Sequence, residues 1–411
     1  MEAKNLSGKG VKKCMQTPLV LRRDILVKFL GAGFTAGLLS PFAGKLAGAP
    51  AADESDPLEQ RTPSRDLSDG IYSRAVEGTY TIPPELKNFW KKTSPLKLVN
   101  AAEIGFNPER WQGDTTRVIY HHGKYHCWTI DFSHGRSPGL TNNPSRDFSA
   151  FGPLVEDHST ALYMTSEDTY NWTAVSYVPL GRPGMYDDGD RLQVNVFHHQ
   201  GKFYMFYEGC TWNVKKYGQI RAGIGCLVAD DPSGPWEYVS DDLILKASQD
   251  DGKSFDSWIL TNPRHVHLNG KWYMYYKGLQ GVGIPTKNGV AVAESITGPY
   301  TKYEGNPILN GHGHFCWRYK HGMLMIPHHD GWIHWSEDGI HFAPIFHNSE
   351  KIFRYGSLYI PNDPLFGKPV ATESGTSFWG FDNPTVSSPG TFPQRLDIQR
   401  MEWGFGESPQ I

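Results

Sequence analysis

Polar side chains that could carry acid–base chemistry precede four apolar segments of the sequence. They are Asp114-Thr115-Thr116-Arg117 before Val118, Val194-Asn195 before Val196, Thr261-Asn262-Pro263-Arg264 before His265, and Gly311-His312-Gly313-His314 before Phe315. Hydrolysis of a glycosidic bond needs one group that protonates the leaving oxygen and a second that activates water. A carboxylate can activate the water, and an imidazole can donate the proton because its pKa lies near working pH. Asp114 is therefore the candidate base and His312 the candidate acid.

The segments that follow these residues repeat along the chain. A turn glycine leads into an alternating aromatic strand at Gly123, Gly201 and Gly270, and into a weaker copy at Gly322. An apolar strand precedes each glycine, which indicates a β-hairpin. A further strand, a turn and an aromatic residue close the units, as in residues 222–236 and 289–300. The chain is therefore built from repeated antiparallel units.

Units of this kind, recurring at intervals of roughly 50 to 80 residues, are typical of a β-propeller. Counting the C-terminal block 353–403 gives five blades. A generic β-sandwich is the alternative, but it would not repeat an internal hairpin so regularly. In a propeller the first strand of each blade lines the central channel, and its start faces the mouth. The sequence predicts an all-β, five-bladed propeller over residues 93–411, in which the polar segments converge on one cavity.

Composition excludes several other classes. The chain has 411 residues with 21 Phe, 20 Tyr and 13 Trp, and a formal net charge of -3. So many aromatic residues exclude a disordered chain, and the charge argues against a nucleic-acid partner. No run of about 20 apolar residues follows residue 50, so membrane-spanning segments are not expected. A soluble protein that binds an oligosaccharide fits best, since aromatic rings stack on sugar faces.

The N-terminal region differs from the rest of the chain. Residues 1–51 combine basic residues, the pair Arg22-Arg23, a Gly- and Ala-rich apolar segment and the sequence Ala49-Pro50-Ala51. This pattern predicts a twin-arginine-like signal peptide and export to the periplasm or the medium; an amphipathic helix is the alternative. Residues 52–92 are expected to form a linker and a short helical arm. The four cysteines beyond residue 51 lack metal-ligand spacing and are expected to be buried thiols, with one disulfide left open.

The four hairpin units resemble glycoside hydrolase family 117, the exo-acting 3,6-anhydro-α-L-galactosidases, which are five-bladed propellers related to families 43 and 62. The resemblance covers roughly residues 66–405. Its most specific part is Asn306-Pro307-Ile308-Leu309-Asn310-Gly311-His312 followed by Trp317, Tyr319, Lys320 and Gly322. Phe255-Asp256-Ser257, Tyr186-Asp187 and Thr116-Arg117-Val118-Ile119 match as well. The resemblance further implies a homodimer, because the N-terminal arm of that family exchanges between protomers.

The resemblance assigns roles to individual residues. The family's general base falls on Asp114 and its acid on His312, but the Glu after that His falls on Gly313. Its blade-three Asp falls on Asn262, and the corresponding blade-two Asp falls on Asn195. An amide can neither act as a base nor tune an acid by charge. The chain is therefore expected to be either a divergent glycosidase or a binding relative with weakened chemistry.

The sequence thus predicts an inverting exo-hydrolase that removes a terminal α-linked 3,6-anhydrogalactose or related sugar from agar- or carrageenan-type oligosaccharides. We expect six residues to hold the sugar: Arg117, Asn195, Trp258, Asn262, His265 and His314. The acidic loop Asp187, Asp188 and Asp190 is expected to be solvated surface or a site for a cation such as Ca²⁺. A Zn²⁺ site at His312 and His314 is left open as well, as is Mg²⁺. The alternatives are a non-catalytic carbohydrate-binding propeller and a family 43-like arabinosidase or xylosidase.

Overall fold

The computed structural model describes most of the repeated region and little of the N-terminal third. The described residues are 81–93, 111–132, 160–179, 181–211, 214–217, 221–250, 252–281, 284–311, 314–327, 332–347, 358–360, 365, 377–382 and 399–407. The predicted signal peptide, most of the 52–92 segment and His312 lie outside them. No helix in the described part of the chain is long and apolar enough to cross a membrane.

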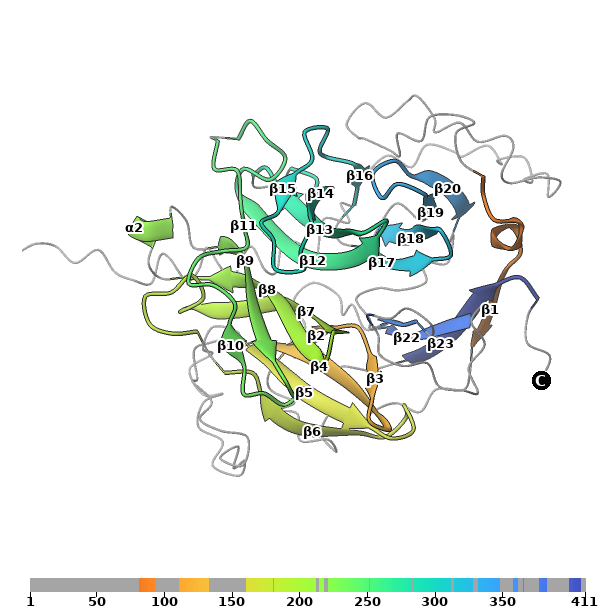
Figure 1. The fold of residues 1–411 in the computed structure, drawn as a ribbon, viewed down its shortest axis with the longest axis horizontal. Helices are drawn as coiled ribbons and strands as arrows, with labels where there is room; N and C mark the ends of the chain where they lie inside the picture. Colours follow the sequence, from red (N-terminus) through yellow and green to blue (C-terminus); the bar gives the residue numbers. More distant parts are fainter. Residues whose placement is uncertain are drawn as a thin grey trace, which may run out of the picture. The chain divides into compact units, whose positions relative to one another are not determined.

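The first two sheets are antiparallel and consist of consecutive strands (Figure 1). Blade one contains β2 (Trp111–Thr115), β3 (Ile119–His121), β4 (Lys124–Phe132), β5 (Thr160–Ser166) and β6 (Trp172–Tyr177). Blade two contains β7 (Asp190–His199), β8 (Lys202–Cys210), β9 (Arg221–Ala229), β10 (Glu237–Tyr238) and β11 (Leu245–Lys246). The short helix α2 (Val214–Tyr217) lies between β8 and β9.

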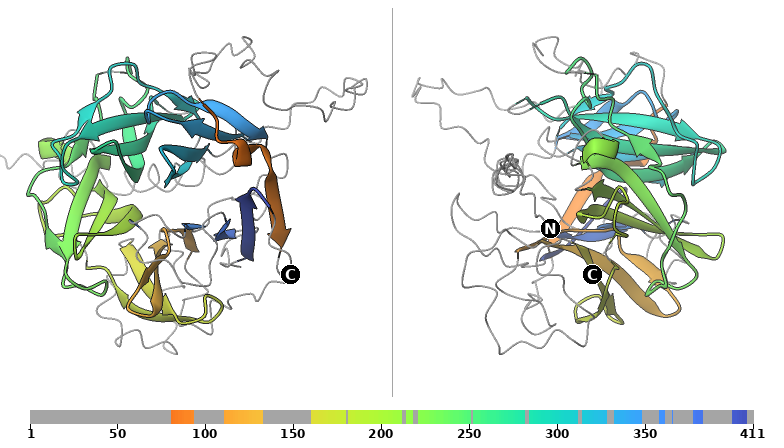
Figure 2. Two further views of the ribbon diagram at one scale, coloured as in Figure 1. Left: turned by 45° about the vertical axis from the view of Figure 1, so that its right-hand side comes forward. Right: turned by 90° about the vertical axis from the view of Figure 1, so that its left-hand side faces the viewer.

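The next two sheets follow the same plan. Blade three contains β12 (Ile259–Leu268), β13 (Lys271–Leu279), β14 (Lys287–Ala293), β15 (Thr301–Lys302) and β16 (Leu309–Asn310). Blade four contains β17 (His314–Tyr319), β18 (Gly322–Pro327), β19 (Trp332–Ser336) and β20 (Ala343–His347). Within Gly48–Ile411 the sheets are arranged around a common centre (Figure 2). The predicted all-β, propeller-like architecture is therefore confirmed.

The fifth sheet differs from the predicted blade because it joins both ends of the described chain. It contains β1 (Phe89–Thr93), β21 (Leu358–Tyr359), β22 (Ser377–Asp382) and β23 (Gln399–Phe405), with β1 paired to β23. The predicted helical arm is wrong for its described part, which is the 3-10 turn η1 (Pro84–Lys87) followed by β1. Phe89 stacks on Phe346 of blade four at 4.1 Å. The sequence could not reveal this strand, because its partner lies some 300 residues away.

The predicted hairpins are confirmed in blades one to three. Their two-residue turns are His122-Gly123, Gln200-Gly201 and Asn269-Gly270, and both residues of each have φ between 48° and 80°. Positive φ at both positions is what a type I′ turn requires, and it suits the right-handed twist of the flanking strands. Each turn therefore fixes the register of its innermost pair of strands.

Alternating side chains of these strands form the core between the blades. The largest buried residues include Trp128, Trp317, Trp335 and Trp403. Cys127, Cys210, Cys226 and Cys316 are free thiols and are all buried, which agrees with the interpretation of these cysteines as small core residues. The aromatic excess of the sequence is thus largely interior packing.

Candidate functional site

The innermost strands of three blades are each interrupted at the same end. The register shifts lie between Gly113 and Thr115 in β2, between Leu192 and Asn195 in β7, and between Thr261 and Arg264 in β12. Gln193 and Asn262 take left-handed φ values of 51° and 52° at the centre of the last two. Bulges bend a strand and re-aim its side chains, and they recur beside active sites. We call the end of the propeller that carries them the mouth; the hairpin turns lie at the other end.

The hairpin register aligns these bulges residue by residue. The register gives each innermost strand one equivalent residue, and these are Ile119, Phe197 and Val266. Two residues earlier in each strand, the equivalent positions are Arg117, Asn195 and Arg264. By the same register the blade-two counterpart of Asn262 is Gln193. Asn195, on which the resemblance places the family's blade-two Asp, therefore aligns with Arg264 in this repeat and not with Asn262.

Beneath the bulges, on the side toward the hairpin turns, lie Arg117, Asn195 and Arg264. Arg117 Nη2 donates to the carbonyl oxygen of Cys316 at 2.5 Å, and so links blades one and four. Asn195 Nδ2 donates to the carbonyl oxygen of Pro263 at 2.8 Å, and Arg264 Nη1 donates to the same oxygen at 3.0 Å. All three side chains are buried. Arg117 and Asn195, expected to hold the sugar, therefore support the mouth from below.

His265 lies in the core and not at the mouth. Its ring is fully buried, with centroids 4.1 Å from Phe206, 4.8 Å from Phe197 and 5.7 Å from Tyr300. Burial, followed by the charges of Arg117 and Arg264, holds the pKa of His265 well below its usual range, so the ring is neutral. His265, expected to hold the sugar, therefore has no exposed surface that a sugar at the mouth could contact.

His314 and Trp258 flank the mouth on blades three and four. His314 is buried, and its Nδ1 lies 2.8 Å from Oδ1 of Asn288. Because the Asn288 amide nitrogen donates to the carbonyl oxygen of Asn310, Nδ1 of His314 is the donor in this pair. Trp258 is half-buried, and its backbone N–H donates to the carbonyl oxygen of Leu279 at 3.0 Å. Both residues are positioned near the mouth by blade three.

The two candidate catalytic residues are placed only in part. Asp114 lies within the β2 bulge, so its backbone is at the mouth, as its interpretation as the base requires. Its side chain, like all of His312, lies outside the described residues. Gly311, directly before His312, has a φ of 126° and ends blade three at the mouth.

Glu208 is a mouth residue that the sequence did not single out. It is fully buried on β8, and its Oε2 accepts a hydrogen bond from the Thr261 hydroxyl of blade three. The same hydroxyl lies 3.1 Å from Oδ1 of Asn262. A comparison of the repeated hairpins could have found it, because Tyr207-Glu208-Gly209 aligns with Tyr276-Lys277-Gly278. An ionisable residue thus occupies the same place in two adjacent blades.

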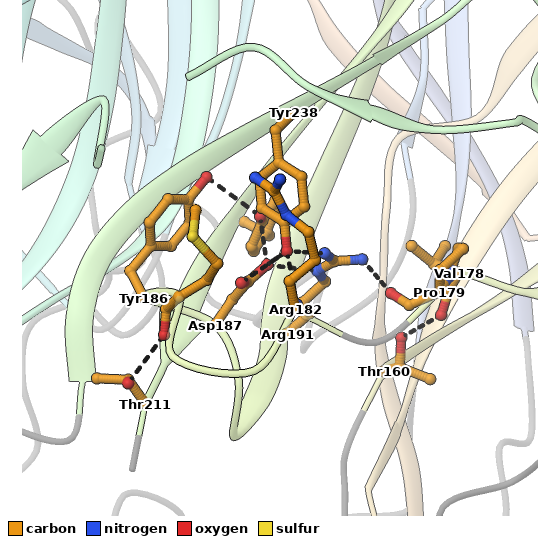
Figure 3. Close-up of polar contacts among 11 residues, drawn as sticks. Thr160, Val178, Pro179, Arg182, Tyr186, Asp187, Arg191, Thr211 and Tyr238 are labelled. Atoms are coloured by element: carbon orange, nitrogen blue, oxygen red, sulfur yellow. Dashed lines mark hydrogen bonds and ion pairs between the residues drawn. The ribbon is translucent and has the colours of Figure 1, made fainter. Parts of the chain in front are cut away.

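The acidic loop of blade two is a buried network and not solvated surface (Figure 3). Asp187 Oδ2 accepts hydrogen bonds from Arg191 Nε at 2.8 Å and from the Tyr207 hydroxyl at 2.7 Å. The Tyr238 hydroxyl donates to Oδ1 of Asp187 at 2.9 Å and accepts from Arg191 Nη2. Asp187 thereby joins the innermost strand to the edge strand β10.

Blade three repeats this arrangement with different partners. Asp256 Oδ2 lies 2.6 Å from Lys302 Nζ of the edge strand β15, and its Oδ1 accepts from Ser248 at 2.7 Å. The interpretation of Asp256 as a structural residue beside the mouth agrees with these contacts. In the described part of the chain no group of three or more His, Cys, Asp and Glu side chains could hold a metal ion. The expected cation site therefore has no counterpart there, since Asp187 is occupied by Arg191 and the tyrosines.

Comparisons with known proteins agree with this architecture. No protein-family model and no curated protein matches the sequence. A family 117 glycoside hydrolase produced by the marine bacterium Zobellia galactanivorans is similar in structure, with a TM-score of 0.56 and 17% identity over 78% of this chain and 91% of that chain. The catalytic domain of a family 62 α-L-arabinofuranosidase from Coprinopsis cinerea aligns with a TM-score of 0.47 and 10% identity over 78% and 98%. The chain therefore has the fold of a family 117 glycoside hydrolase.

Proposed function

We propose that this chain is a glycoside hydrolase that acts at the mouth of the propeller. The observation that carries the proposal is the set of aligned bulges in β2, β7 and β12, which brings polar positions of three blades to the same end of the propeller. Asp114, Gln193 and Asn262 lie in these bulges. The fold shared with a family 117 glycoside hydrolase supports the same conclusion.

The proposed reaction is inverting hydrolysis of a terminal α-linked 3,6-anhydrogalactose or related sugar from a galactan oligosaccharide. Asp114 accepts a proton from water, whose oxygen then bonds to the anomeric carbon. The bond from that carbon to the leaving oxygen breaks, and His312 donates a proton to this oxygen. Asn262 and Trp258 would orient the sugar at the rim, with Arg117, Asn195 and Arg264 buried beneath it. Export and an N-terminal dimer contact remain predictions of the sequence.

A panel of agar and carrageenan oligosaccharides, analysed by product chromatography and by NMR of the released anomer, tests this proposal. We expect one terminal sugar to be released with inverted configuration. Asp114→Asn should lower kcat by at least about 100-fold. Asp230→Asn is the matched control, since that carboxylate is 83% exposed and pairs with the exposed Lys202. If Asp114→Asn retains full turnover, Asp114 is not the base.

A carbohydrate-binding propeller without catalysis is the second candidate. It is favoured by the amides at the bulge centres, Gln193 and Asn262, which cannot take up a proton from water. Titration calorimetry with the same oligosaccharides separates the two functions. Saturable binding without any released sugar would replace the hydrolase by the binding protein.

A further inference from the structure

Asn288 is a buried amide near the mouth to which the proposed reaction gives no role. It is the second residue of β14, and its side chain has no solvent exposure. Asn288 pairs with Lys277 as Ile224 pairs with Glu208, so its blade-two equivalent is Ile224 of the apolar core. An amide costs free energy to bury unless its polar atoms are hydrogen-bonded, so an aliphatic residue would serve better for packing alone. The contacts of the amide therefore have to account for its presence.

Both ends of the Asn288 amide are bonded to the segment that connects blades three and four. Its Nδ2 donates to the carbonyl oxygen of Asn310 at 3.3 Å, and its Oδ1 accepts from Nδ1 of His314 at 2.8 Å. A carbonyl oxygen can only accept, so the amide cannot turn over without placing two oxygens against each other. The side chain of Asn288 thereby closes a loop that runs from Asn310 to His314. The residue at the centre of this loop is His312, the candidate acid.

The first end of the loop is held on blade three. Residues 309–310 form β16, which pairs with the start of β14. The N–H of Gly311 donates to the carbonyl oxygen of Thr286 at 3.2 Å, and the Thr286 hydroxyl donates to the carbonyl oxygen of Gly311 at 2.8 Å. Gly311 has a φ of 126°, which glycine adopts at no steric cost. The residue directly before His312 is thus bonded at both of its backbone groups.

The second end of the loop is held on blade four. His314 begins β17, where it pairs with Pro327, and its side chain is buried. Its ring packs edge-on against Tyr275 of blade three, with centroids 6.0 Å apart. The Tyr275 hydroxyl in turn donates to the carbonyl oxygen of Gly339 in blade four at 2.7 Å. Asn288 therefore joins two ends that are each held by other contacts, so its loss would loosen the loop without detaching it.

Blade two has a different pair of residues at the equivalent places. Its β11 pairs with β9 as β16 pairs with β14. Continued by two residues along the chain, this register makes Ser248 the counterpart of His312. Blade two thus combines Ile224 with a serine, whereas blade three combines Asn288 with a histidine. The two differences occur together, as expected if the amide serves the histidine.

We infer that Asn288, together with Thr286, is a positioning residue for the acid of the proposed reaction: the two side chains fix the backbone on either side of His312. The inference rests on the proposed function, because an acid must lie within hydrogen-bond reach of the leaving oxygen to protonate it. Loss of the Asn288 amide should therefore slow the protonation step without weakening the binding of the sugar.

Kinetics of the full chain on the cleaved oligosaccharide test the inference. We expect Asn288→Ala to lower kcat at least about tenfold and to leave KM within about twofold. Thr286→Val should lower kcat as well, whereas Thr286→Ser, which keeps the hydroxyl, should not. Asn306→Ala is the matched control and should keep kcat, because the Asn306 amide also bonds β14, at the N–H and the carbonyl oxygen of Val290, but lies outside the loop.

A substrate whose leaving group needs no proton separates positioning of the acid from general damage. The 4-nitrophenyl glycoside of the released sugar is such a substrate, because nitrophenolate leaves without being protonated. Asn288→Ala and His312→Ala should therefore keep kcat on this glycoside within about threefold of the wild type, whereas Asp114→Asn should lose it. A site that is merely disrupted would lose turnover on both substrates.

The outcomes separate this inference from the proposed function. Asn288→Ala with the kcat of the Asn306→Ala control on the oligosaccharide would overturn the inference and leave the hydrolase intact. So would equal losses of Asn288→Ala on the two substrates. Should Asn288→Ala fail to fold, as judged by its circular dichroism, Thr286→Val and Thr286→Ser decide the same question on the same substrates. A wild-type chain that cleaves none of the oligosaccharides would overturn the proposed function, and the inference with it.

Discussion

Neutralising the equivalent carboxylates of blades two and three should destabilise the protein by different amounts. Asp187 and Arg191 have side chains that are 0% and 2% exposed, and two tyrosine hydroxyls complete the contacts of Asp187. Asp187→Asn would leave the guanidinium buried without its charge partner, which costs about 3–5 kcal/mol. Lys302, the partner of Asp256, is 26% exposed and can turn to water. Asp256→Asn should therefore cost only about 1–2 kcal/mol.

Urea unfolding at pH 7, followed by tryptophan fluorescence, measures both losses as shifts of the midpoint at constant slope. Asp230→Asn removes an exposed ion pair with Lys202 and should change the free energy of unfolding by less than about 0.5 kcal/mol. The two losses differ because Arg191 is buried and Lys302 is partly exposed, whereas the two carboxylates are equally inaccessible. Equal losses for the two variants, or a larger one for Asp256→Asn, would refute this explanation.

Two further measurements test the ends of the blades. At the hairpin end, burial and the neighbouring rings of His198, His122 and His126 lower the pKa of His121 to about 4. The pKa of an unfolded histidine is about 6.5, so the contribution of His121 to stability is complete above pH 6.5. The free energy of unfolding should fall by about 1–2 kcal/mol, allowing for solvent screening, as the pH drops toward 4. Urea midpoints measured across this range should lose this pH dependence in His121→Gln. Gly225→Ala places a Cβ 2.3 Å from the Tyr186 ring and should cost about 1–3 kcal/mol, whereas Gly281→Ala, with its nearest atom at 3.5 Å, should leave the midpoint unchanged.

Much of the fold could be predicted because the relevant signals are local. A type I′ turn needs two residues of positive φ, and the sequence marks one of the two by its glycine, at Gly123, Gly201 and Gly270. The aromatic alternation after each turn then gives the faces of the strands. The role of β1 could not be predicted in this way. Phe89 gains its burial from Phe346 and Phe405, and neither is near in sequence.

The site was harder to predict because burial and bulges decide which side chains reach the mouth. His265 follows the bulge of β12, and strand alternation turns it into the aromatic core. Arg117 and Asn195 lie one layer below the bulges for the same geometric reason. Glu208 was not predicted because it lies on the second strand of its blade, whereas the predicted site residues lie at the starts of the innermost strands. The bulges themselves leave no mark in the sequence except their departure from the expected spacing.

The distribution of charge at the mouth limits what the protein can do there. Blades two and three keep their outer carboxylates, Asp187 and Asp256, but each binds a cation of its own blade and is not available to a substrate. The bulge centres of the same blades carry amides. The proposed hydrolysis would then depend on Asp114, whose backbone lies in the β2 bulge. Asp114→Asn is for that reason a more direct test of the proposed reaction than neutralising Asp187 or Asp256.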